Sequence, residues 1–381
     1  MRGTLLLPAL LLALPVSAQD QDEKSTTIVV TGVSPADSEA RLAACLARNC
    51  PPREDIEASL AHAENQFIAG DYAGARRTLG KSRNRNDRYA RVLPVEVSDL
   101  NRAYGRLSNF DGRPDQSRLL QIEALEALKA GLDDKDSRVL MQRLMVGDEF
   151  ARAGRLRAAE DIYRTVAKQA RKAGQLHVVG QAMLRDAVVF GAMASVRSDY
   201  RSTARRKIAD IERTAEPELA GFRHAARLLR ASLAAYENDP EALEKAIAAV
   251  PPQKSGKPVL IYAPPIRIEK ITAGGGQILP ASEGGPEWID VRFRIAADGR
   301  VHDAGVLRDS GNIARDWPKL VLESVSRRRY APLLTQGEGA NRVERFSYVH
   351  DLMLETGSRI VRRASDGRLT SLDLTDDTPR N

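Results

Sequence analysis

The sequence predicts a multidomain α+β protein, in which an α-solenoid of helical hairpins precedes a small β-hairpin–helix–β domain. In the segment 51–252, apolar residues recur at helical spacing, as in Leu119, Ile122 and Leu125. Aromatic residues make up only 5% of the chain, and Ala, Leu and Arg are abundant, which favours helix over sheet. The segment 289–295 instead alternates apolar and charged residues, which is the pattern of a half-buried strand.

The first residues indicate export. An apolar run at 5–14 follows Arg2 and is too short to span a bilayer. Val16-Ser17-Ala18 then offers the small residues at which a signal peptidase cleaves. We therefore expect residues 1–18 to be a signal peptide cleaved near Ala18, the mature chain to be periplasmic, and residues 19–50 to form a flexible linker.

The two cysteines of the chain, Cys45 and Cys50, both lie in the exported part. An oxidising compartment favours a disulfide between them. Residues five apart in a continuous helix are too distant to bridge, but Pro51-Pro52 should end a helix near Asn49 and permit the bond. Metal binding is the alternative, although two lone cysteines are not a complete ligand set.

A repeated pattern runs through the helical region. Its two clearest copies are Gly147, Phe150, Gly154, Leu156, Ala159 and Tyr163, and upstream Ala63, Phe67 (one residue off register), Gly70, Tyr72, Ala75 and Leu79. These spacings resemble those of a tetratricopeptide (TPR) repeat, in which small residues let two helices approach and aromatics fill the gap between hairpins. A degenerate third copy runs through 231–243, with Asn238-Asp239-Pro240 in place of the turn glycine. A plain helical bundle is the alternative.

The C-terminal third divides into a linker, a domain and a tail. Residues 253–285 are rich in glycine and proline and are expected to be a linker, with one possible lone strand at Ile266–Ile271. Residues 286–354 form the predicted domain, and residues 355–381 are expected to be a polar tail. Within the domain, Asp298-Gly299 predicts a tight hairpin turn after the first strand. A helix at Asp316–Tyr330 and a final strand at about 343–353 should follow.

Three short motifs mark this order of elements: Asp298-Gly299-Arg300-Val301 after the first strand, Ser310-Gly311 before the helix, and Arg329-Tyr330-Ala331-Pro332 at its end. With these motifs, the region resembles the C-terminal domain of the energy-transducing protein TonB. The resemblance covers about 70 residues. The Tyr-Pro element that often precedes the first strand in the family is displaced here to Tyr262-Ala263-Pro264-Pro265, so the start of the domain is open. A generic small α+β domain is the alternative.

The resemblance implies a mode of binding, because the TonB domain receives an extended peptide of an outer-membrane transporter as an added strand. The partner-binding edge would then be the final strand. Its expected residues are Val343, Arg345, Phe346, Ser347, Tyr348 and Val349. The run Ile28–Gly32 also resembles the short box that TonB binds in transporters, although a linker without such a role is the alternative reading.

No motif in the sequence specifies catalysis, a cofactor or a metal. The five histidines are scattered, and Gly80-Lys81-Ser82 and Gly274-Gly275-Gly276 lack the context of nucleotide-binding loops. A pI near 9.4 favours acidic partners, but nucleic acid is not expected for an exported protein. We therefore expect a non-enzymatic adaptor associated with TonB-dependent transport, whose helical repeat binds a second, unknown protein. The alternative is a TonB-type energy transducer anchored by an uncleaved N-terminal segment.

Overall fold

The computed structural model describes residues 34–236, 240–248, 250, 252, 258–266, 286–313, 316–334, 339–354 and 361–375. The predicted signal peptide, the Ile28–Gly32 run and most of the 253–285 linker lie outside these residues. The helices of the N-terminal part are α1 (Pro35–Ala47), α2 (Pro52–Ile68), α3 (Tyr72–Asn86), α4 (Pro94–Phe110), α5 (Pro114–Gly131), α6 (Ser137–Arg152), α7 (Leu156–Lys172), α8 (Leu176–Val196), α9 (Arg201–Glu212), α10 (Ala220–Tyr236) and α11 (Pro240–Ala248).

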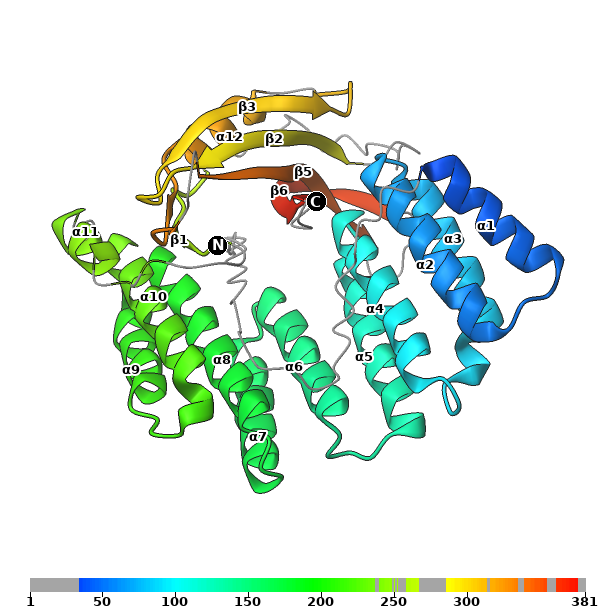
Figure 1. Ribbon diagram of the computed structural model, residues 1–381, viewed down its shortest axis with the longest axis horizontal. Helices are drawn as coiled ribbons and strands as arrows, with labels where there is room; N and C mark the ends of the chain where they lie inside the picture. Colours follow the sequence, from blue (N-terminus) through cyan, green and yellow to red (C-terminus); the bar gives the residue numbers. More distant parts are fainter. Residues whose placement is uncertain are drawn as a thin grey trace.

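These helices form TPR-like antiparallel hairpins that stack in an arc (Figure 1). Gly70, Gly112 and Gly154 join the helices of the first three pairs, and they follow one another at intervals of 42 residues. Each has a positive φ, between 73° and 89°, which favours glycine. After each of them, the next residue donates its N–H to the carbonyl five positions earlier, at 2.8–2.9 Å. This Schellman closure ends the first helix of each pair in the same way.

The hairpin interiors follow the predicted pattern of small and aromatic residues. A Cβ on Gly147 would come within 2.6 Å of the Tyr163 ring, so α6 and α7 approach as closely as glycine allows. Ala159 and Tyr163 are fully buried, as are Tyr72 and Ala75 in the first hairpin. The third predicted copy corresponds to α10 and α11, with Asn238-Asp239 outside the described residues.

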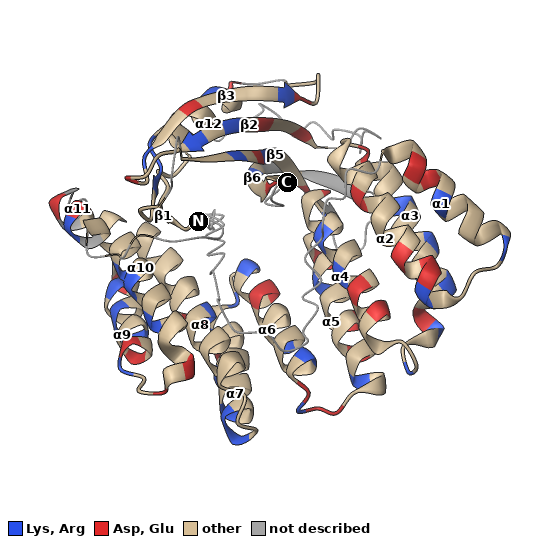
Figure 2. Ribbon diagram, in the orientation of Figure 1, with Lys and Arg blue, Asp and Glu red and all other residues tan. Residues whose placement is uncertain are grey.

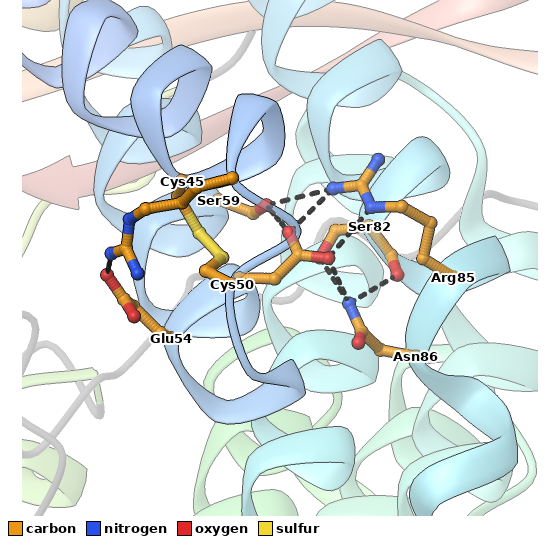
Figure 3. The surroundings of a disulfide bond; sticks show 9 residues. Cys45, Cys50, Glu54, Ser59, Ser82, Arg85 and Asn86 are labelled. Carbon is orange, nitrogen blue, oxygen red and sulfur yellow. Dashed lines mark hydrogen bonds and ion pairs between the residues drawn. A yellow bond between two sulfur atoms is a disulfide. The ribbon is translucent and has the colours of Figure 1, made fainter.

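The predicted flexible linker at 19–50 is wrong for its last part, because α1 occupies Pro35–Ala47. Ser34 caps this helix by accepting a hydrogen bond from the Asp37 N–H, and a proline stands in the first turn. After α1, Asn49 adopts a φ of 52°, and Cys50 is joined to Cys45 in a disulfide with Cα atoms 5.1 Å apart (Figure 3). The chain reversal brings the two cysteines together, and α1 covers the open side of α2.

The C-terminal part contains a four-stranded antiparallel sheet with the order β3-β2-β5-β6. Its strands are β2 (Glu287–Ile295), β3 (Val301–Asp309), β5 (Ala340–Leu354) and β6 (Val361–Asp373). The helix α12 (Trp317–Ser326) packs on one face, where Phe293, Val321 and Phe346 belong to one apolar core. A separate small ladder pairs β1 (Leu260–Tyr262) with β4 (Arg329–Tyr330).

The predicted order of hairpin, helix and strand is present, but two boundaries are wrong. The helix ends at Ser326 rather than Tyr330, and Arg329-Tyr330 form β4, whose partner β1 the sequence pattern did not reveal. The polar tail predicted at 355–381 contains β6, which pairs with β5 along most of its length. Alternation in β6 is weak because most of its residues are polar, so hydrophobic period alone could not identify it.

The sheet spans the two ends of the helical arc, so the elements form a closed ring (Figure 1). At one end Val259 and Ile261 share an apolar core with Leu228 of α10 and Ile247 of α11. At the other end β2, β5 and β6 contact the turns that end α2 and α4. Within the described ranges, no helix is long and apolar enough to cross a membrane.

Candidate partner-binding surfaces

The strand predicted to be the partner-binding edge lies inside the sheet. The strand β5 pairs with β2 on one side and with β6 on the other, so Val343–Val349 face no free edge. The prediction that this strand is a free edge is wrong, because β6 already occupies the side of β5 to which an added peptide would have to pair. Phe346 and Tyr348 face α12 in the core. Arg345, Ser347 and Val349 are also buried, on the face turned toward the helical repeat.

Arg345 is the centre of the contact between the sheet and the repeat. Its side chain is 1% exposed and makes an ion pair with Asp290 of β2, with Nε 2.7 Å from one carboxylate oxygen. Its two terminal nitrogens donate to the carbonyls of Phe67 and Ile68, each at 2.8 Å. These are the last carbonyls of α2, where unsatisfied acceptors and the negative end of the helix dipole favour a cation. Burial by itself would lower the pKa of Arg345, but the bond to Asp290 raises it above its usual value.

An aromatic ring completes this contact. The guanidinium of Arg345 lies 3.9 Å from the ring centroid of Trp288, in cation–π geometry. Trp288 belongs to the apolar core of the first hairpins, and its ring lies against Gly70. A Cβ on Gly70 would lie 3.0 Å from the indole, so the turn glycine permits both the positive φ and the approach of the sheet.

The sheet also contacts the second turn, at Gly112, through an arginine and a backbone hydrogen bond. Arg368 of β6 donates to the carbonyl of Asn109 at 2.6 Å, near the end of α4, and its Nε bonds Asp351 at 2.8 Å. The N–H of Leu352 donates to the carbonyl of Gly112 at 2.6 Å. A Cβ on Gly112 would come within 2.4 Å of the His350 carbonyl oxygen. We call these contacts at the first two turns the arginine clasp, defined by Arg345, Arg368 and the turns of Gly70 and Gly112.

The third turn is open. Gly154 has nearly the same φ as Gly112, but a Cβ placed on it would meet no atom of the described residues within 4 Å. The arginine clasp therefore covers two of three equivalent turns.

Strand β3 forms one outer edge of the sheet. Among the strands that the structure describes, β3 pairs with β2 alone. Val306 and Leu307 on it are 42% and 51% exposed, so two adjacent apolar side chains of this strand are accessible to a partner. Asp303 has a φ of 56°, and the register shifts twice along the strand, so bulges interrupt the ladder. The sequence did not predict that this strand is an exposed edge, because its apolar residues do not alternate with polar ones.

Charged residues of both signs are interspersed over the helices (Figure 2). Many form surface pairs within one helix, such as Arg164 with Asp161 and Arg213 with Asp210. This arrangement is typical of solvated helix faces rather than of a basic binding stripe. No group of three or more His, Cys, Asp or Glu side chains in the described part of the chain could hold a metal ion.

The comparisons with known proteins place the chain in no family: no family model and no characterised protein matches it. Among solved structures, BtubC (BKLC) from P. vanneervenii is similar with a TM-score of 0.42 and 13% identity, over 59% of this chain and 95% of that chain. A putative kinesin light chain from Podosopora anserina with nearly identical TPR-like repeats gives a TM-score of 0.38 and 12% identity, over 52% and 94% of the two chains. Similarities this low decide neither fold nor function. The TPR-like description therefore rests on the hairpins themselves, and the TonB resemblance of residues 286–354 stays a prediction.

Proposed function

We propose that the chain is an exported, non-enzymatic adaptor that binds proteins and acts with TonB-dependent transporters of the outer membrane. A stack of TPR-like hairpins supports the first half of this proposal, because such repeats present an extended surface to other proteins. The apolar run and small residues before Gln19 support export, and the residues from Asp298 to Pro332 support the link to TonB.

The observation that carries the proposed binding mode is the outer edge of β3. Its backbone groups on this side pair with no described strand, and the exposed Val306 and Leu307 add apolar surface. An extended peptide gains affinity at such an edge from main-chain hydrogen bonds, and specificity from alternate side chains. The partner segment should therefore be extended, apolar and β-branched. We place strand addition at β3 because β5 is already paired on both sides.

A labelled peptide with the sequence of Thr27–Gly32 is a suitable probe, since it is rich in β-branched residues. Binding to the whole protein is measured by fluorescence anisotropy, and the site is located by hydrogen exchange. We expect slower exchange of amides in 301–309 when the peptide is bound. A peptide of the same sequence with alternate amides N-methylated should not bind, because strand addition requires those donors.

A matched pair of variants separates the edge from general hydrophobic binding. Leu307→Lys should weaken peptide binding at least tenfold, because a lysine on an edge strand opposes pairing. Leu119→Lys on α5 changes a leucine of comparable exposure, 58%, and should leave binding unchanged. Equal losses in both variants, or protection confined to the helices, would exclude β3 as the peptide site. An uncut Met1–Ala18 segment in membrane fractions, found by mass spectrometry, would instead support the anchored transducer.

A further inference from the structure

We infer that the C-terminal sheet is a strap that fixes the curvature of the helical repeat and that opens at the arginine clasp. Stacked repeats contact only their neighbours, so nothing within a solenoid holds its two ends together. In this chain the sheet does so, because it is attached both to α10–α11 and to the turns after α2 and α4. The ring is closed only while both attachments persist.

The two attachments differ in connectivity. The sheet follows α11 directly in the sequence, through β1, and shares an apolar core with α10 and α11. Glu244 of α11 adds ion pairs to Arg329 and Arg300. At the clasp, by contrast, Arg345 and Arg368 bond carbonyls of residues 278 and 259 positions away, and no chain segment joins them locally. Opening must therefore occur at the clasp.

The chemistry of the clasp favours two distinct states. Arginine–carbonyl and arginine–carboxylate bonds need defined geometry, so they are made or lost together rather than stretched. Arg308 joins the same group through Asp290, at 2.6 Å, and reaches the carbonyl of Ile68. When the clasp separates, water can replace each of these polar partners. Separation would also expose the face of β5 that carries Arg345, Ser347 and Val349, which the closed ring hides.

The equivalent turns of the repeat allow a controlled test. Gly112→Ala places a methyl group where the His350 carbonyl oxygen lies, and should push the sheet away. Gly154→Ala introduces nearly the same backbone strain, because its φ is 73° and that of Gly112 is 74°, but its methyl group meets none of the described residues. Arg368→Gln removes a clasp bond without any backbone strain. Together these variants distinguish loss of the clasp from strain within the repeat.

The distance between the first helical hairpin and the sheet can be measured in the full chain by pulsed electron paramagnetic resonance. One spin label is attached at Lys81→Cys on α3 and the other at Leu307→Cys on β3. Both positions are exposed, and Cys45 and Cys50 are joined to each other and do not react with the label. We expect one narrow distance distribution in the parent protein and in Gly154→Ala. Gly112→Ala and Arg368→Gln should increase the fraction of long distances at least threefold. The inference is overturned if both keep the parent distribution, or if Gly154→Ala broadens it as much as Gly112→Ala does.

Discussion

Trp288 lies directly against Gly70, although the two residues are far apart in the sequence. The nearest indole atom is 3.0 Å from the position of a Cβ on this glycine. The turn of the first hairpin is therefore shaped both by its own closure and by the sheet above it. The same turn provides the carbonyls that bind Arg345, so one local motif serves the repeat and the domain contact.

Replacing Gly70 with alanine should cost about 2–4 kcal/mol of unfolding free energy, measured by chemical denaturation. Part of this cost is the strain of an alanine at a φ of 89°, and part is the clash with Trp288. Gly154→Ala carries the first cost but not the second, so it should lose only about 1–2 kcal/mol. Equal stability of the two variants would show that Trp288 does not contact Gly70 closely in solution.

Replacing Arg345 with methionine should destabilise the protein by about 3–5 kcal/mol, because a buried charge loses its partner. Asp290, which is fully buried, would keep Arg308 as its ion-pair partner, and the carbonyls of Phe67 and Ile68 would each lose the hydrogen bond from Arg345. Arg213→Met changes an arginine in an exposed pair and should alter stability by less than about 1 kcal/mol. Thermal unfolding of the two variants beside the parent measures this difference. A shift for Arg345→Met no larger than that for Arg213→Met would contradict a buried clasp.

Asp55 should make stability depend on pH in the acid range. Burial by itself would raise the pKa of this carboxyl, but hydrogen bonds from Arg85, Asn86 and Ser59 outweigh the effect of burial, so the pKa lies below 3.8. A depressed pKa stabilises the fold fully above the unfolded value of 3.8, and this contribution is lost as the pH falls through the folded value.

Asp55→Asn should therefore be less stable than the parent at pH 7, by about 1–3 kcal/mol. The difference should shrink below pH ~4. Urea unfolding at a series of pH values gives both quantities. Asp161→Asn, in an exposed pair with Arg164, is the control and should change neither. A constant gap between Asp55→Asn and the parent from pH 7 to pH 2 would contradict the lowered pKa.

Loss of the disulfide should cost about 2 kcal/mol, because the closed loop between Cys45 and Cys50 is short. The variant with both cysteines changed to alanine should lose protection from hydrogen exchange in α1 first, since α1 packs chiefly on α2. Thiol labelling of the unreduced, denatured parent protein tests the bond itself. Two reactive thiols there would show that the bond is absent.

The sequence alone determined the local structure with a strong physical signature. Helices were predictable over 51–252 because apolar residues recur at helical spacing, and the Gly147–Tyr163 pattern located one hairpin. The β2–β3 hairpin was predictable because Asp298-Gly299 supplies the residues that a tight turn requires. The 42-residue interval of Gly70, Gly112 and Gly154 was also present in the sequence, and could have identified the three equivalent turns.

Tertiary structure alone decided which surfaces are covered. The strand β6 has no strong alternation, and it is ordered by pairing with β5, so its presence changed the predicted edge strand into an inner one. Arg345 and Arg368 resemble ordinary surface arginines in the sequence, yet both bind carbonyls at helix ends far away in the chain. The residue pattern of a segment shows which of its sides is apolar. It cannot show which distant backbone carbonyls that segment will contact, because those contacts form only when the ring closes.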